Sequence, residues 1–237
     1  MTRGLAAAER QLASVGAVLM SPADLNACLG TDDHAWTRFS EHWDALAPDR
    51  YAAELGTQRL RRYGHFVFRP AEGVGELLPP DAFVQPQASN PLYVERHRYF
   101  EPLTEAFARD PLLAAMLKLL GQLATALHAV PEWNAKVTPF RVVASAEQEG
   151  QPTPEGLHRD GVTLVSSLLI RLRNATGGES SVYDMAGSRL LTTTLCEPAT
   201  LLLGDDRRTL HGVTAIRPLD PGEPAQRDVL VITFAPR

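Results

Sequence analysis

The fold is decided by the stretch Gly156-Leu157-His158-Arg159-Asp160-Gly161, which stands directly before a largely apolar run over 162–172. Side chains two residues apart point to the same side of an extended chain, so a strand beginning here would place His158 and Asp160 on one face. An imidazole and a carboxylate on one face can share a metal ion. A His-x-Asp pattern alone is common and usually means only a polar loop or a His–carboxylate hydrogen bond. A third ligand must decide between these interpretations.

His211 is the best placed of the other histidines, because it stands at the head of another strand-like run, 212–216. Two imidazoles and one carboxylate leave three coordination positions open, which is typical of non-heme Fe(II) oxygenases. Further on, Arg227 opens the strand-like run 227–234. Its planar guanidinium can pair through two hydrogen bonds with a dicarboxylate such as 2-oxoglutarate. The pattern therefore predicts a metal and an anion in one pocket.

These segments together resemble one bacterial family of iron- and 2-oxoglutarate-dependent dioxygenases. The family includes hydroxylases of free aliphatic amino acids such as L-isoleucine, and biofilm- and stress-associated proteins. The resemblance covers the C-terminal third well and extends more weakly back to about residue 60. It is carried by residues 151–161, Arg171-Leu172-Arg173-Asn174, Gly177-Gly178-Glu179, Asp205-Asp206-Arg207-Arg208, His211-Gly212 and Arg227-Asp228-Val229-Leu230.

The resemblance implies Fe(II) bound by His158, Asp160 and His211, with 2-oxoglutarate held at Arg227 and O2 as the third reactant. It implies hydroxylation of a small molecule, with release of succinate and CO2. A free amino acid is the substrate that it suggests. The substrate's identity, the carbon attacked and the stereochemistry are not readable from the sequence.

One position departs from the wider oxygenase pattern. Many members of the superfamily carry a serine or threonine two residues after the distal arginine, where this chain has Val229. Another hydroxyl, from Thr233 or Tyr183, is then expected to assist Arg227 in binding the cosubstrate. Arg217 is the alternative to Arg227, although the sequence around the latter matches the family better.

Four residues are candidates for substrate binding. Gln85 and Asn90 belong to the proline-rich segment 77–90, where the family tends to carry such amides, but an ordinary loop that bonds to itself is equally consistent. Arg141 is a candidate for a substrate carboxylate. Glu155 is a candidate for a substrate ammonium, or it merely caps the turn before His158.

Two charged groups have both a structural and a functional interpretation. Arg61 and Arg62 open the strand-like run 61–69, either as solvated charges or, as the resemblance implies, at the rim of the pocket. The mixed run 205–208 is more typical of a turn network that positions His211 than of catalytic groups.

The secondary-structure pattern predicts a mostly β protein with helices. The strongest helix is 111–129, capped by Asp110, and further helices are expected over 6–18, 21–30 and 34–46. Eight short strands predict a double-stranded β-helix, the cupin-like jelly roll, with the N-terminal helices packed on its major sheet. The strands are expected at 61–69, 136–146, 161–171, 179–184, 189–195, 199–203, 210–216 and 228–234.

The domain organisation expected is a single domain over 1–237. Its part over 1–132 is expected to be helical, with one or more strands and a pocket-covering loop, and its jelly-roll core over 133–237 to carry the metal and cosubstrate site. A composition with 44% hydrophobic and 22% charged residues is that of a globular protein with a sizeable core.

Charge and composition exclude several partners. The net charge of −5 without a basic stripe argues against nucleic acid and anionic membranes, and favours a small-molecule partner. No window approaches the ~18 apolar residues of a membrane span, and no signal peptide is evident. Two distant cysteines, Cys28 and Cys196, are expected to be reduced thiols, so a cytoplasmic location is expected, while the oligomeric state is left open.

Two alternatives from other classes remain. A non-catalytic cupin-like protein that binds a small molecule, or acts in a stress response, could use the same fold. A cupin metalloenzyme that does not use 2-oxoglutarate usually carries a His-x-His ligand pair, which this sequence lacks.

Overall fold

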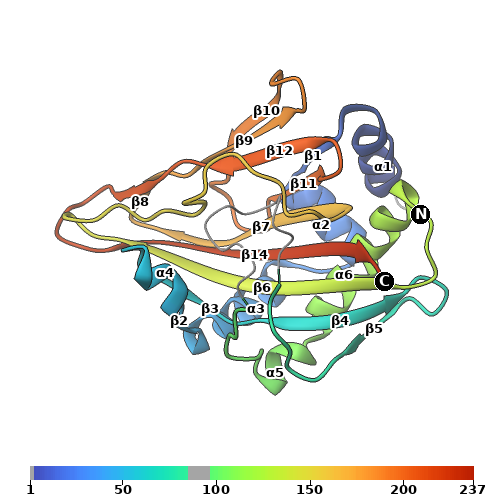
Figure 1. Cartoon of the computed structure of the whole chain (residues 1–237), viewed down its shortest axis with the longest axis horizontal. Helices are drawn as coiled ribbons and strands as arrows, with labels where there is room; N and C mark the ends of the chain where they lie inside the picture. Colours follow the sequence, from blue (N-terminus) through green and yellow to red (C-terminus); the bar gives the residue numbers. More distant parts are fainter. Residues whose placement is uncertain (1–2, 85–96) are drawn as a thin grey trace.

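The computed structural model describes residues 3–84 and 97–237, which form two facing β-sheets with helices on the outer side of the larger one (Figure 1). The helices are α1 (Arg3–Val15), α2 (Pro22–Leu29), α3 (Asp33–Ser40), the 3-10 helix η1 (Glu41–Ala45), α4 (Arg50–Glu54), α5 (Glu105–Ala108) and α6 (Pro111–Leu127).

The major sheet runs in the order β1-β11-β7-β14-β6-β3-β2, with β4 also paired to β6 and β5 paired to β4. Every pairing is antiparallel, and β14 is paired along most of its length on both sides. The strands are β1 (Ala17–Met20), β2 (Ala47–Pro48), β3 (Arg59–Arg61), β4 (Gly64–Arg69), β5 (Val74–Leu77), β6 (Trp133–Ala144), β7 (Leu164–Arg173), β11 (Leu201–Asp205) and β14 (Ala225–Pro236).

The minor sheet has the order β10-β9-β12 and lies over the major one (Figure 1). Its strands are β9 (Glu179–Asp184), β10 (Arg189–Thr194) and β12 (Thr209–Val213), and β8 (Ala175–Gly177) pairs with β13 (Ile216–Pro218) beside it. Single bridges at Gly150↔Ile216 and His158↔His211 carry the chain before β7 along the same side. The two sheets thus enclose a space between them.

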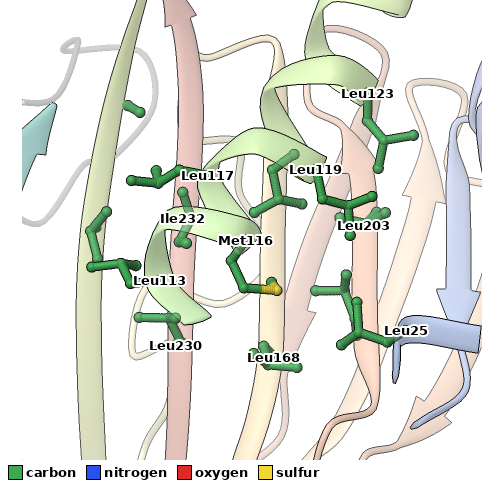
Figure 2. Packing of buried hydrophobic residues seen from close by; sticks show 14 of the residues in the cluster. Leu25, Leu113, Met116, Leu117, Leu119, Leu123, Leu168, Leu203, Leu230 and Ile232 are labelled. Atoms are coloured by element: carbon green, nitrogen blue, oxygen red, sulfur yellow. The ribbon is translucent and has the colours of Figure 1, made fainter. Parts of the chain in front are cut away.

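The outer face of the major sheet is the hydrophobic core. Helix α6 packs a leucine-rich stripe against the residues of β7, β11 and β14 that point to this face (Figure 2). Leu230, Ile232 and Phe234 alternate along β14 and are fully buried here. Transferring such side chains from water stabilises the fold by about 1.5–3 kcal/mol each. The alternate residues of the same strands face the minor sheet instead.

Local signals in the sequence fix the helix ends. The Ser21 hydroxyl accepts the N–H of Asp24 at the start of α2, and Gly30 ends that helix with a left-handed φ of 63°. Asp110 caps α6 as predicted, by accepting the N–H of Leu112. The helix expected over 34–46 is α3 followed by η1, because the chain tightens after Ser40.

The mostly β double-stranded β-helix with helices on its major sheet is confirmed. Each of the eight predicted strand regions contains strand, although 61–69 and 210–216 are each interrupted. The short strands β1, β2, β5 and β8 were not expected. In the described part of the chain, no helix is both long and apolar enough to cross a membrane.

Candidate metal and cosubstrate site

Three of the predicted residues meet between the two sheets. The backbone N–H of His158 donates to the carbonyl of His211 (3.0 Å), and the N–H of His211 donates back to the carbonyl of His158 (2.9 Å). This bridge sets the two rings with centroids 4.4 Å apart. The strand expected to begin at His158 is therefore a partner of β12, and β7 begins only at Leu164.

The two imidazoles turn the same nitrogen toward Asp160. Nδ1 of His158 lies 2.9 Å from the carbonyl of Gly156, which fixes the ring and leaves Nε2 at 3.7 Å from the Asp160 carboxylate. Nε2 of His211 lies 3.7 Å from the other oxygen of that carboxylate. One ligand atom from each of the three residues lies within 4.8 Å of the others. Two imidazole nitrogens and one carboxylate on one side of an ion fit Fe(II) with open positions.

Asp206 supports these side chains from behind. Its carboxylate accepts the backbone N–H groups of Asp160 (3.1 Å) and Val162 (2.9 Å), and lies 3.7 Å from Nδ1 of His211. Burial and the nearby charge of Asp160 raise the pKa of Asp206. Burial lowers the pKa of His211, which favours the neutral imidazole that a metal requires. Asp206, which belongs to the 205–208 turn, thus makes contacts with Asp160 and His211 of the kind expected from a positioning network.

Arg227, near the start of β14, reaches the same cavity. It is 2% exposed, and its Nη2 has no hydrogen-bond partner in the described residues. Burial lowers the pKa of Arg227 to about 10, so the guanidinium is charged at neutral pH. A Cβ on Gly178 would lie 3.5 Å from the Cδ and Nε atoms of this arginine, which is ordinary van der Waals contact, so Gly178 adjoins the Arg227 side chain. A buried cation with an unsatisfied N–H fits a bound carboxylate.

The two hydroxyls expected to assist Arg227 lie elsewhere. Thr233 lines the cavity but stands six residues further along β14, roughly 20 Å away at the rise of a strand. Tyr183 follows Val182, which is the residue opposite His211 in the pairing of β9 with β12. Opposed residues share a face, so Tyr183 points to the other side and does not line the cavity.

Arg141 does not face the cavity either. It stands opposite Asp228 on the helix-covered face, and its guanidinium donates two hydrogen bonds of 2.7 Å to that carboxylate. It is therefore a paired structural cation and not a substrate ligand. Arg217, the alternative to Arg227, is mostly exposed on β13 and is bonded to Glu149.

Of the remaining substrate candidates, only Glu155 is placed at the cavity. Its Oε1 lies 3.5 Å from Nε2 of His158, and its side chain is largely buried. Gln85 and Asn90 lie outside the described residues.

Sequence reasoning missed most of the cations that line this cavity. Arg59, Arg98 and Lys136 are among its walls, and Arg61 is buried there, whereas the neighbouring Arg62 donates outward to the carbonyls of Ala45 and Pro102. The two-residue period of the strand β6 could have indicated Lys136, because it shares a face with the cavity-lining Thr138, Phe140 and Val142.

Comparison with known proteins agrees with this geometry. The family model described as 2OG-Fe dioxygenase matches residues 40–233. The crystal structure of a bsmA homolog from Methylobium petroleophilum PM1 is 36% identical, with a TM-score of 0.91 over 100% of this chain and 94% of that one. No curated protein sequence matches the chain.

Two more distant structures share the fold alone. IDO from Bacillus thuringiensis is 18% identical, with a TM-score of 0.80 over 100% of this chain and 97% of that one. The Fe(II)/α-ketoglutarate-dependent dioxygenase TqaL is 15% identical, with a TM-score of 0.76 over 100% and 90% of the two chains.

Proposed function

The chain belongs to the 2OG-Fe dioxygenase family, and from that premise we propose that it hydroxylates a free amino acid, with Fe(II) bound by His158, Asp160 and His211. Membership makes it a 2-oxoglutarate-dependent dioxygenase that uses Fe(II), 2-oxoglutarate and O2. The observation that carries the residue assignment is the charged and buried Arg227 in the same cavity as the His–Asp–His cluster, with an Nη2 that has no hydrogen-bond partner in the part of the chain that the structure describes.

The proposed roles follow from the contacts of each residue. Arg227 holds the distal carboxylate of 2-oxoglutarate by donating from its unsatisfied Nη2. Asp206 holds the backbone of Asp160 and so keeps its carboxylate turned toward the two imidazoles. Glu155, beside His158, is the candidate for the substrate ammonium.

The walls of the cavity favour an aliphatic group near the reacting centre. Val213, Val229 and Val231 line it together with the proposed ligands, so a hydrocarbon chain replaces water there at little cost. When bound, Fe(II) with 2-oxoglutarate and O2 supplies the oxidation: one oxygen atom enters succinate as CO2 leaves, and the other enters a substrate C–H bond as hydroxyl. The side chains hold the substrate so that one C–H bond faces the iron.

The test is succinate formation by the purified protein with Fe(II), ascorbate, O2 and 2-oxoglutarate, with and without each free L-amino acid. We expect one or a few amino acids to raise succinate and to gain one oxygen atom in mass. His158→Ala should abolish this, whereas His128→Ala, at an exposed histidine after α6, should not. Stimulation by no free amino acid would refute the substrate assignment, and an active His158→Ala would refute the ligand assignment.

A further inference from the structure

The cavity holds a second buried cation that the cosubstrate does not require. Arg61 on β3 stands opposite Phe140 of β6, on the face that lines the cavity, and it is 3% exposed. Arg227 stands opposite Val142 of the same strand β6. The two arginines therefore lie on the two neighbours of β6, at positions that differ by two residues along it. Their Cα atoms are roughly 12 Å apart at the usual strand spacing and rise. They enter the cavity from separate positions.

Aromatic rings hold the Arg61 guanidinium in place. Its Cζ lies 3.6 Å from the ring centroid of Phe100, 4.7 Å from that of Phe140 and 4.9 Å from that of Phe83. Rings stack on the faces of a planar guanidinium and leave its N–H edges available. Arg61 is thus rigid before any ligand arrives, which lowers the entropy lost on binding.

The N–H groups of Arg61 are poorly supplied with acceptors by the described residues. Its Nε has no hydrogen-bond partner in the described residues, and its Nη2 reaches the Thr138 hydroxyl only at 3.5 Å. The carboxylate of Asp49 acts on it electrostatically, but that carboxylate is already paired with Arg59 at 2.8 Å. A buried guanidinium whose donors are unsatisfied is costly to maintain, and a bound carboxylate would satisfy it.

Two more cations strengthen the positive field at this wall. Arg98 lies with its Cζ 5.0 Å from the Phe83 ring centroid, and Lys136 lies with its Nζ 4.9 Å from the same centroid. Both side chains line the cavity with Arg61. Three cations around one phenyl ring favour an anionic group of the ligand at this end.

We propose that Arg61, supported by Arg98 and Lys136, binds the carboxylate of the prime substrate, so that the enzyme selects small carboxylic acids. The inference rests on the proposed function, because the distal carboxylate of 2-oxoglutarate is assigned there to Arg227, which leaves Arg61 for a carboxylate of the substrate. It adds the group by which the substrate is recognised and the residue that recognises it.

The test measures binding to the protein loaded with Fe(II) and 2-oxoglutarate without O2, by calorimetry. The probes are free L-amino acids and, for each, the matching primary amide, which keeps the side chain and the ammonium but lacks the carboxylate charge. We expect an amino acid to bind and its amide to bind at least about tenfold more weakly. Arg61→Gln should weaken the acid by a similar factor and remove the preference over the amide, and Arg61→Lys should restore only part of it, because ammonium lacks the planar fork.

The matched control is Arg62→Gln, which removes the adjacent arginine that points out of the cavity. It should leave the preference for the acid unchanged. The visible absorption of 2-oxoglutarate chelated to Fe(II) should persist in Arg61→Gln, which shows that the fold and the cosubstrate site are intact. Loss of that absorption at saturating 2-oxoglutarate, equal binding of acid and amide to the unaltered protein, or acid binding unaffected by Arg61→Gln would overturn the proposal.

A third set of probes separates this inference from the amino acid assignment. Carboxylic acids with the same side chains but no amino group are tested beside the amino acids. If only these acids bind, and do so through Arg61, the carboxylate site stands and the amino acid assignment fails. If amino acids drive succinate formation equally in Arg61→Gln, the assignment stands and the carboxylate site fails. If neither class of acid binds, the carboxylate site is overturned.

Discussion

Alternate residues of β14 face opposite sides of the major sheet, and the two sides have different chemistry. Leu230, Ile232 and Phe234 are fully buried against the helices. Arg227 and Thr233 face the minor sheet and the cavity. One strand therefore contributes both to the stability of the fold and to the site, because a period of two sends neighbouring side chains to different surroundings.

Cations show the difference most clearly. On the helix-covered face, Arg141 is paired with Asp228 through two hydrogen bonds of 2.7 Å. On the cavity face, Arg227 and Arg61 each keep a buried N–H without an acceptor in the described residues. Arg141 is thus distinguished from Arg227 and Arg61 by the protein carboxylate that pairs with it. Substitutions on the helix face should change stability, and substitutions on the cavity face should change ligand binding.

The largest effect on the cavity side is expected from His211→Ala. Removal of one of three proposed ligands leaves too few donors for Fe(II), so succinate formation should fall below detection. The midpoint of urea unfolding in the metal-free protein should shift little, because the ring is partly exposed and its Nδ1 has no hydrogen-bond partner among the residues described. Full activity in this variant would contradict the assignment.

The largest effect on the helix side is expected from Phe234→Ala. This change removes a ring that contacts Phe68 and Trp133 in the core, and should lower the free energy of unfolding by about 3–5 kcal/mol. Urea unfolding measures the loss, and Fe(II) affinity at low temperature should be retained in the folded fraction. A loss below about 1 kcal/mol would show that the helix face does not dominate stability.

A smaller effect on the cavity side is expected from Asp206→Asn. The amide keeps the size of the side chain, but its single oxygen can accept only one of the two N–H groups, from Asp160 and Val162, that the two carboxylate oxygens accept. Iron affinity should fall about 10–100-fold, as is usual when a group behind a metal ligand is changed. Competition with a chelator measures it, and an unchanged affinity would remove Asp206 from the site.

The smallest effect, on stability, is expected at Asp49, which forms an ion pair with Arg59. Arg59 lines the cavity but has a protein carboxylate as its partner, so its contribution should be to the fold. Burial opposes the ionisation of Asp49, but the charges of Arg59 and Arg61 and the N–H of Ala52 outweigh burial and lower the pKa of Asp49. A lowered pKa stabilises the fold above the unfolded value of about 3.9, and that stabilisation is lost as pH falls through the lower folded value.

Asp49→Asn should therefore cost about 1.5 kcal/mol near pH 7, because asparagine can still cap α4. The difference from the unaltered protein should shrink below about pH 4. Unfolding by urea at both pH values measures this, and a difference independent of pH would contradict the ion pair.

The sequence predicted that His158, Asp160 and His211 lie together, from the spacing of the first two residues and from the family resemblance that implies the third. His158 and Asp160 are two residues apart, and the sequence around His211 is strand-like, so local periodicity predicts the direction of each side chain. The eight strand regions and α6 were predicted for the same reason, since their apolar residues recur with the period of the element. The strand β1 was missed because its four residues follow a helix directly and are too few to show the two-residue alternation of a strand.

The surroundings of the cluster depend on pairing partners that the sequence does not contain. Thr233 was expected beside Arg227, but it stands six residues further along the extended strand β14. Arg141 and Tyr183 were placed in the pocket although strand register turns both away from it. Arg61 acquires its significance from Phe83, Phe100 and Phe140, which lie on three separate segments. Such contacts are set by tertiary packing.

The most direct test compares two arginines on opposite faces of the same sheet, Arg227→Gln and Arg141→Gln. Anaerobic titration of Fe(II)-loaded protein with 2-oxoglutarate, followed by the visible absorption of the chelate, is the measurement. We expect Arg227→Gln to weaken 2-oxoglutarate binding at least about tenfold with little change in stability, and Arg141→Gln to lower stability while the folded protein binds 2-oxoglutarate normally. Normal binding by Arg227→Gln, or loss of binding in folded Arg141→Gln, would contradict the division between the two faces.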